Sequence, residues 1–186
     1  MGRAKYHWVK QQSGEDCAAA SLAIVCSHHG RPMRIDRIRQ AVETGSGGAT
    51  FASLRRGAEA LGFLTKVLHA PREWLDSIDA QPMPAILYWK GYHLVVLYGC
   101  ERAATQNGAG DVYVVSDPGM GVRRLSRAEL EEGWHGGIVL ILKPHPVRFY
   151  LQEPDTQRLG SAIWRHLNAE RSALVAVSVL GVATGA

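Results

Sequence analysis

The pattern of hydrophobic and polar positions changes its period about one third of the way along the chain. Up to Gly62, apolar residues recur at helical spacing between residues that typically cap or end helices. We therefore predict an extended segment at residues 6–10, followed by helices at residues 17–29, 34–43 and 50–61. Beyond Gly62, short runs rich in Val, Ile, Leu and Tyr replace the helical pattern and predict strands.

The second part of the chain predicts an antiparallel sheet. We expect its strands at residues 63–68, 84–89, 93–99, 111–116 and 138–143. One short helix is predicted at Pro71–Ile78, and a capping box formed by Ser126 and Glu129 predicts another. Because helices come first and strands follow, the fold class is α+β, with N-terminal helices packed on a mainly antiparallel sheet.

Composition narrows the classes of function. The 186 residues are 46% hydrophobic, which suits one compact domain with some surplus chain. The net charge is only +4, and the arginines are spread without interleaved aromatic residues, so we expect no nucleic-acid partner. Three cysteines without CxxC spacing argue against a disulfide framework or structural zinc. No HExxH or GxxxxGK[ST] pattern occurs, so we expect no metal site and no P-loop in this chain, and residues 1–10 lack the apolar region of a secretory signal.

The C-terminal part has a different character. Residues 157–172 are amphipathic, and residues 173–186 carry no charge at all. The uncharged stretch is shorter than the roughly 20 residues that a bilayer-spanning helix needs. We interpret it as the beginning of a transmembrane helix in a longer protein. The alternative is a buried C-terminal helix of a soluble protein.

Cys17 is the first candidate for chemistry. Asp16 or a neighbour can cap the helix that Cys17 opens, and a helix N-terminus stabilises the reactive thiolate. Cys26 follows nine residues later in the same predicted helix and, at about 100° per residue, points to the opposite side, toward the core. Cys100 ends a strand, where a structural role is expected. A free cysteine is commonly a small buried hydrophobe, so Cys17 needs a base to be a nucleophile.

His93 and Asp117 are the candidate base and its orienting group. His93 opens an apolar strand, and Asp117 closes another. If the two strands pair antiparallel with Leu97 opposite Tyr113, His93 lies directly opposite Asp117. Each residue alone has a simpler interpretation without a catalytic role: His93 as a strand-end histidine bonded to water, and Asp117 as a turn residue before Pro118 and Gly119.

A nucleophilic cysteine that attacks a carbonyl also needs hydrogen-bond donors for the oxyanion. A side-chain amide and a backbone N–H can serve together. Gln11 lies six residues before Cys17, and Gln12 is a competing candidate. Spacing alone does not separate the two.

Five stretches together resemble the C39 peptidase domain of bacterial peptidase-containing ABC transporters. They are VKQQSGEDCAAASLAIVCSHHG, TFASLRRGAEALGF, MPAILYWKGYHLVVLYG, VYVVSDPGMGVRRLSRAEL and WHGGIVLILKP, and they cover about residues 6–145 in order. The resemblance implies a papain-like peptidase domain at residues 1–145. It further implies a linker with an amphipathic helix at 146–172 and the start of a membrane helix at 173–186.

The resemblance also implies an activity and its residues. Members of the family cleave leaders from precursor peptides, such as bacteriocins and pheromones, after a Gly-Gly-type motif. Carried over by match, Cys17 is the nucleophile, His93 the general base and later acid, Asp117 its orienting group, and Gln11 the oxyanion donor. One departure is visible, because Ala18 stands where the family commonly has glycine, and its methyl group would narrow the leaving-group side of the cleft.

Partners follow from the same resemblance. We expect a double-glycine leader that binds as an amphipathic helix in an apolar groove, and a narrow cleft whose walls include Trp89, Tyr92 or Trp134 unless these are core residues. The transporter would be a homodimer in the bacterial inner or plasma membrane, with the peptidase on the cytoplasmic side. We expect no cofactor here, since ATP would bind a nucleotide-binding domain outside this chain. The alternatives are a non-cleaving docking domain and a freestanding soluble peptidase with residues 147–186 packed on it.

Overall fold

The computed structural model describes residues 6–45, 47–101 and 110–151. The chain divides into two units, Met1–Asp155 and Thr156–Ala186, and the described residues all belong to the first. The predicted amphipathic segment and membrane helix lie outside the described residues, so they and the domain boundaries stay predictions. Within the described ranges, no helix is both long and apolar enough to cross a membrane.

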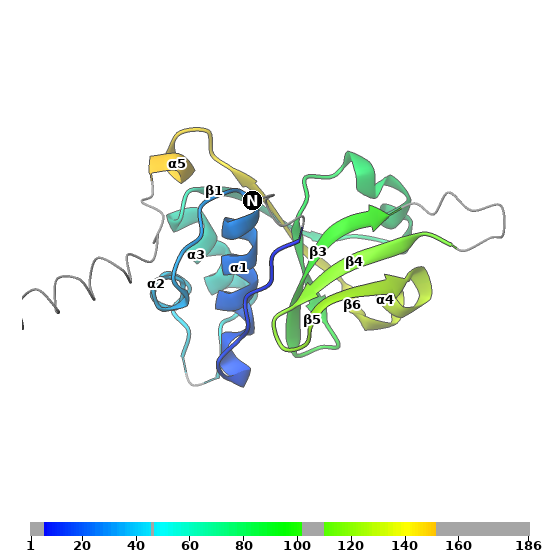
Figure 1. Ribbon diagram of the computed structural model, residues 1–186, viewed down its shortest axis with the longest axis horizontal. Helices are drawn as coiled ribbons and strands as arrows, with labels where there is room; N and C mark the ends of the chain where they lie inside the picture. Colours follow the sequence, from blue (N-terminus) through cyan, green and yellow to red (C-terminus); the bar gives the residue numbers. More distant parts are fainter. Residues whose placement is uncertain (1–5, 46, 102–109, 152–186) are drawn as a thin grey trace, which may run out of the picture. The chain divides into compact units, whose positions relative to one another are not determined.

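Helices precede strands along the chain, as the sequence pattern predicts (Figure 1). The helical elements are η1 (Gly14–Asp16), α1 (Cys17–His28), α2 (Ile35–Ala41), α3 (Phe51–Ala60), η2 (Arg72–Ala80), α4 (Arg127–Gly133) and α5 (Arg148–Leu151). The strands are β1 (Phe63–His69), β2 (Ala85–Trp89), β3 (His93–Glu101), β4 (Val112–Asp117), β5 (Gly121–Ser126) and β6 (Trp134–Pro144). The α+β fold class is therefore confirmed.

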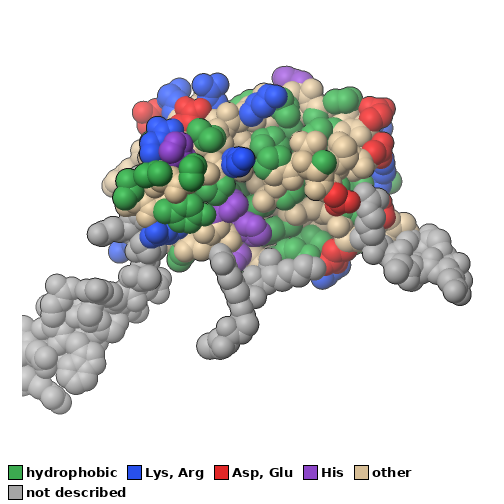
Figure 2. Space-filling model, turned by 90° about the horizontal axis from the view of Figure 1, so that it is seen from above, with side chains coloured by type: hydrophobic (Ala, Val, Ile, Leu, Met, Phe, Trp, Pro, Cys, Tyr) green, Lys and Arg blue, Asp and Glu red, His purple; other side chains and the backbone are tan. Residues whose placement is uncertain are grey.

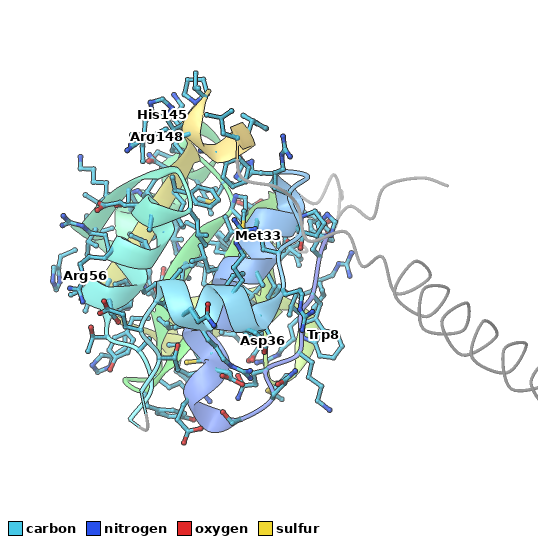
Figure 3. All side chains as sticks on the ribbon, turned by 90° about the vertical axis from the view of Figure 1, so that its left-hand side faces the viewer. Trp8, Met33, Asp36, Arg56, His145 and Arg148 are labelled. Atoms are coloured by element: carbon cyan, nitrogen blue, oxygen red, sulfur yellow. The ribbon has the colours of Figure 1, made fainter. Side chains whose placement is uncertain are left out.

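The helical layer is built around α1. All residues from Ala18 to Cys26 are buried, so this helix is enclosed on every side and has no solvated face. Its small side chains let it lie close to the sheet, and Ser21 donates a hydrogen bond to the Leu94 carbonyl of β3. Thr50 caps α3 by accepting from the Ser53 N–H, as predicted. Figure 3 shows this layer from outside, with Asp36 on α2 in front of α1.

The strands form one antiparallel sheet in the order β1-β6-β2-β3-β4-β5. One hydrophobic core fills the space between the sheet and helices α1 to α3, and it includes Phe149 from α5. A second core, around Tyr113 and Leu130, includes residues of η2 and α4. On the face seen in Figure 2, Lys and Arg side chains are scattered among acidic and hydrophobic ones.

Strand β5 was not predicted from the sequence. It pairs with β4 throughout, from Val112 opposite Ser126 to Asp117 opposite Gly121. As the last strand of the sheet it alternates between exposed and partly buried positions, and only Leu125 is buried. Edge strands with charged residues lack the apolar run that identifies inner strands.

The predicted register between β3 and β4 is wrong. Leu97 lies opposite Val115 and not Tyr113, which is a shift of two residues. Beyond Leu97 the register shifts again at an irregularity before Gly99, whose φ is +134°. If the pairing of Leu97 with Val115 is continued to the ends of the strands, Asp117 lies diagonally from His93 and not directly opposite it. Diagonal neighbours on paired strands are still close enough for their side chains to meet.

Candidate active site

Cys17 lies where the N-terminal loop turns into α1. Residues 14–16 form the single turn η1, and Cys17 is the first residue of the helix that follows. The thiol is partly exposed and lines a cleft of about 510 Å³. Other walls of the cleft are formed by Thr50, Phe51, Tyr88, Tyr92, Leu94 and Ile138. Cys17 is therefore both accessible and placed at a helix N-terminus.

His93 and Asp117 meet at neighbouring strand ends. Nε2 of His93 lies 2.9 Å from Oδ1 of Asp117, and the Gly119 N–H donates to the same oxygen at 2.8 Å. Side-chain exposure is 15% for His93 and 4% for Asp117, so water competes little for their hydrogen bond. The expected proximity of these two residues is thus observed, although by a different register.

The protonation of His93 depends on these contacts. Burial of the ring disfavours the imidazolium, but hydrogen bonds and charge interactions with Asp117 and Cys17 outweigh burial and raise the pKa of His93 to about 9. Since Nε2 bonds Asp117, the other ring nitrogen, Nδ1, is the one left to face the Cys17 sulfur. Burial also acts to raise the pKa of Asp117, yet the hydrogen bonds from His93 and Gly119 lower it below its usual value. A carboxylate and an imidazolium are therefore the favoured forms near neutral pH.

Gln11 and Gln12 have different surroundings. The Gln11 N–H donates to the Pro118 carbonyl at 3.1 Å, and the Gln11 side-chain amide lies near Gly119, beside Asp117. Its Oε1 is buried and accepts no hydrogen bond from the described residues. The side chain of Gln12 instead accepts a hydrogen bond from Arg39 at 2.8 Å and belongs to an exposed residue. Gln11 is therefore the amide beside the His93–Asp117 pair.

Two expectations about the cleft walls need correction. Trp89 and Trp134 are 5% and 6% exposed and belong to the second core, because they pack against the strands and η2. Tyr92, in contrast, is 79% exposed and lines the cleft together with Cys17. The Ala18 side chain is fully buried in the first core, so its methyl group does not narrow the cleft.

The other two cysteines lie elsewhere. Cys26 is completely buried in the core around α1, in agreement with its predicted direction, and burial raises the pKa of its thiol to about 12. Cys100 is partly exposed near the end of β3. Across the part of the chain that the structure describes, no three His, Cys, Asp or Glu side chains form a group that could hold a metal ion.

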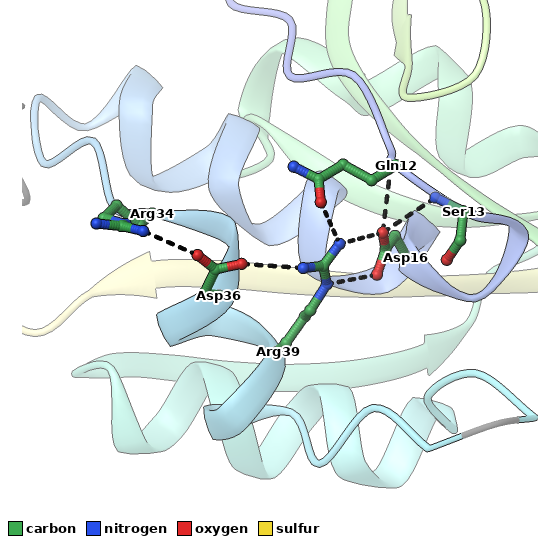
Figure 4. Close-up of polar contacts among 6 residues, drawn as sticks. All are labelled: Gln12, Ser13, Asp16, Arg34, Asp36 and Arg39. Carbon is green, nitrogen blue, oxygen red and sulfur yellow. Dashed lines mark hydrogen bonds and ion pairs between the residues drawn. The ribbon is translucent and has the colours of Figure 1, made fainter.

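Sequence reasoning missed an ion pair directly beside Cys17. Asp16 was expected to cap α1, and it does occupy the N-cap position, but its side chain makes no capping hydrogen bond. It pairs with Arg39 of α2 instead (Figure 4). No local spacing signals a contact between residues 23 positions apart.

A cysteine at a helix N-terminus that faces a histidine–aspartate pair on the adjoining sheet defines a papain-like cysteine peptidase. The model of the peptidase C39 family matches residues 5–146, and the chain therefore belongs to this family. The resemblance seen in the sequence is confirmed.

Known proteins extend this result. The colicin V secretion/processing ATP-binding protein CvaB of Escherichia coli is 31% identical over 136 residues, which are 73% of this chain and 18% of that protein. This chain spans about a fifth of the length of the curated relatives that it matches first.

Solved structures agree with the fold. A double glycine motif protease from an AMS/PCAT transporter, crystallised with its leader peptide, has a TM-score of 0.66 and 26% identity, covering 77% of this chain and 94% of that one. The peptidase domain of Streptococcus ComA has a TM-score of 0.64 and 27% identity, covering 75% and 99%.

Proposed function

We propose that this domain removes leaders from bacteriocin-like or pheromone precursor peptides by cutting after a Gly-Gly-type motif. The observation that carries the proposal is the hydrogen-bonded pair of His93 and Asp117 next to Cys17 in an open cleft. Family membership and the leader peptide bound to the related double glycine motif protease support this choice of substrate.

In the first half of the reaction, the Cys17 proton resides on His93 as the imidazolium, and the Cys17 thiolate attacks the carbonyl carbon of the second glycine. The Gln11 amide and the Cys17 backbone N–H stabilise the resulting oxyanion. The imidazolium then gives its proton to the leaving amine as the C–N bond breaks. The core peptide departs, and the leader stays attached to Cys17 as a thioester.

In the second half, His93 accepts a proton from water, and the hydroxide formed attacks the thioester carbonyl. The C–S bond breaks, the leader leaves as a carboxylic acid, and the Cys17 thiolate is restored beside the His93 imidazolium. Asp117 keeps Nε2 of His93 engaged throughout, so that Nδ1 stays directed at the reacting atoms.

The shape of the cleft supports a preference for glycine at the cleaved peptide bond. Tyr92 and Tyr88 stand on the walls that Cys17 shares, and bulky aromatic walls favour residues without side chains. Phe51, Val67 and Ile138 give the same cleft an apolar part, which suits the hydrophobic side of a helical leader.

The transporter context is a further part of the proposal. Its support is the secretion/processing names of relatives about four times as long as this chain, together with the uncharged residues 173–186. In this view residues 146–172 link the peptidase to a membrane domain of a homodimeric exporter. The peptidase would lie on the cytoplasmic side of the membrane, and ATP would act at a separate nucleotide-binding domain. A requirement of the full chain for detergent would support the membrane segment, and a monodisperse detergent-free chain would contradict it.

The test is cleavage of synthetic precursor peptides encoded beside this gene, with the full 186-residue chain under reducing conditions and mass spectrometry as the readout. We expect a cut after the second glycine that the Cys17→Ala variant does not make. Cys26→Ala is the matched control and should cut normally, because Cys26 is buried away from the cleft. If the wild-type chain binds these precursors and cuts none, the domain is a docking module.

A further inference from the structure

Arg39 reaches across from α2 to the residue that precedes the candidate nucleophile (Figure 4). Its Nε donates to Oδ1 of Asp16 at 2.7 Å, and its Nη2 donates to Oδ2 at 2.5 Å. The Asp16 side chain is 4% exposed and that of Arg39 28%. This is the two-pronged contact in which a guanidinium binds a carboxylate most strongly and with fixed orientation.

The Asp16 carboxylate in turn holds the loop before it. Its Oδ2 accepts hydrogen bonds from the backbone N–H groups of Gln12 at 3.2 Å and Ser13 at 3.1 Å. Gln11 is tied on its other side, because its own N–H donates to the Pro118 carbonyl. The backbone on both sides of Gln11 is therefore fixed, once by the turn after β4 and once by Asp16.

The remaining donors of Arg39 complete the arrangement. Nη1 donates to Asp36 on the same helix at 2.9 Å, which orients the guanidinium, and Nη2 also donates to Oε1 of Gln12 at 2.8 Å. Gln12 is thereby held by Arg39, while Gln11 is the amide left near Asp117. Arg39 is not among the residues that line the cleft, so its role here is argued through Asp16.

Charge gives a second reason for the pair. Asp16 is buried immediately before Cys17, where an uncompensated carboxylate would either repel a thiolate or take up a proton. The hydrogen bond from Arg39 lowers the pKa of Asp16 despite burial. Without Arg39, a neutral Asp16 would accept the two backbone N–H groups less strongly, and the loop would be free to shift.

We propose that Arg39 is a positioning residue for peptide cleavage, which acts through Asp16 to hold the Gln11 amide and the Cys17 backbone N–H where the oxyanion forms. This inference rests on the proposed function. It predicts a cost in kcat and not in KM, because the oxyanion exists only after attack.

The experiment compares the full-length wild type with Arg39→Met, Arg39→Lys and the control Arg124→Met on one cleavable synthetic precursor. Arg124 makes an exposed ion pair with Glu101 and does not line the cleft, so its loss removes the same charge elsewhere. We expect Arg39→Met to lower kcat by about tenfold to a hundredfold, with KM changed less than about twofold. Arg39→Lys keeps the positive charge but loses the two-pronged contact, so its kcat should lie between those of Arg39→Met and the wild type. The kcat of Arg124→Met should match that of the wild type.

Two further readouts separate positioning from general damage. In a Gln11→Ala background, Arg39→Met should lower kcat by a clearly smaller factor than in the wild type, because one of the two donors that Arg39 positions is already gone. Alkylation of Cys17 by iodoacetamide, followed by peptide mapping, needs no oxyanion donor, so its rate should stay within about twofold of the wild type in Arg39→Met.

Several results would overturn the inference. An unchanged kcat in Arg39→Met, with wild-type cleavage intact, would refute the role of Arg39 and leave the proposed function standing. Additive losses with Gln11→Ala, or an alkylation rate that falls as much as kcat, would place its effect elsewhere. If Arg39→Met does not fold, the inference is tested on Arg39→Lys instead. A wild-type kcat in Arg39→Lys would refute the need for the two-pronged guanidinium contact. A wild-type chain that cuts no precursor would overturn the proposed function and this inference with it.

Discussion

Asp16 and Asp117 are both 3% exposed, yet the two halves of the site use these carboxylates differently. In the helical half, Asp16 pairs with a permanent cation, Arg39, and also binds two backbone N–H groups of its own loop. In the sheet half, Asp117 pairs with His93, whose charge depends on pH, and with one backbone N–H. The first carboxylate holds the shape of a loop, whereas the second sets the protonation of a ring.

This difference predicts how each half responds to substitution. Strands β3 and β4 are joined by backbone hydrogen bonds, so His93 and Asp117 stay neighbours even if one side chain is changed. The loop from Gln11 to Cys17 has no such ladder: it is held by isolated backbone hydrogen bonds, such as that of the Gln11 N–H with Pro118, and by the side-chain contacts of Asp16. A change in the sheet half should therefore alter chemistry with little movement, and a change at Arg39 should alter geometry.

The largest effect in this comparison is expected for Asp117→Asn. The amide keeps the shape but loses the charge that favours the imidazolium, and it no longer fixes which ring nitrogen carries a proton. We expect kcat to fall about a hundredfold or more and the free energy of unfolding to fall by about 1–3 kcal/mol, because a buried, hydrogen-bonded carboxylate is lost. Steady-state kinetics and urea unfolding measure the two quantities. A kcat close to that of the wild type would contradict the role given to Asp117.

The same variant should move the pH profile. The pKa of His93 is about 9, above the ordinary value of 6.5, so the stability from its contacts is complete below pH 6.5 and is lost as pH rises through about 9. The wild-type kcat/KM should decline over the same upper range, because the imidazolium that protonates the leaving amine disappears. In Asp117→Asn this alkaline decline should begin at a lower pH. An unchanged alkaline limb would show that it does not report His93.

The sequence indicates the candidate site residues but not the contacts that hold them in place. Cys17, His93 and Asp117 stand out because each is reactive or polar at the end of an apolar element, and resemblance to a family selected Gln11. The Asp16–Arg39 pair joins two helices across the fold, and such a contact leaves no period in the sequence. Trp89 and Trp134 were ambiguous for a related reason, since an aromatic side chain suits a core and a cleft wall equally well.

Helices and strands were predictable from the sequence where one face of the element, or the whole element, is buried. The fully buried α1 and the inner strands carry long apolar runs, while β5 lies at the sheet edge and carries Arg123 and Arg124. The β3–β4 register also changes by one residue at the irregularity between Leu97 and Gly99, which no alternation pattern reveals. The expected register was two residues off, so each strand kept the alternation of its side chains and the two site residues still met.

A smaller effect is expected for Ser116→Ala. Ser116 is completely buried on β4, and its hydroxyl donates to the His7 carbonyl at 2.9 Å, which holds the N-terminal segment against the sheet. We expect a loss of about 1–2 kcal/mol in the free energy of unfolding and a kcat within about twofold of the wild type. Ser77→Ala is the control, because that hydroxyl is exposed on η2 and bonds only locally among the contacts described. A tenfold loss of kcat would mean that the sheet half also depends on side-chain contacts for its geometry.

The smallest effect is expected for Cys26→Ala, which compares the two ends of α1. Burial raises the pKa of Cys26 to about 12, so it holds almost no thiolate near neutral pH, and Ala removes only a sulfur atom from the core. We expect about 1 kcal/mol less stability and an unchanged kcat. Iodoacetamide should label Cys17 in the folded wild type and leave Cys26 unlabelled, while both react after unfolding in urea. Equal labelling of the two thiols in the folded chain would mean that α1 opens on the timescale of the assay, and the fully enclosed helix could then no longer be the rigid support of the nucleophile.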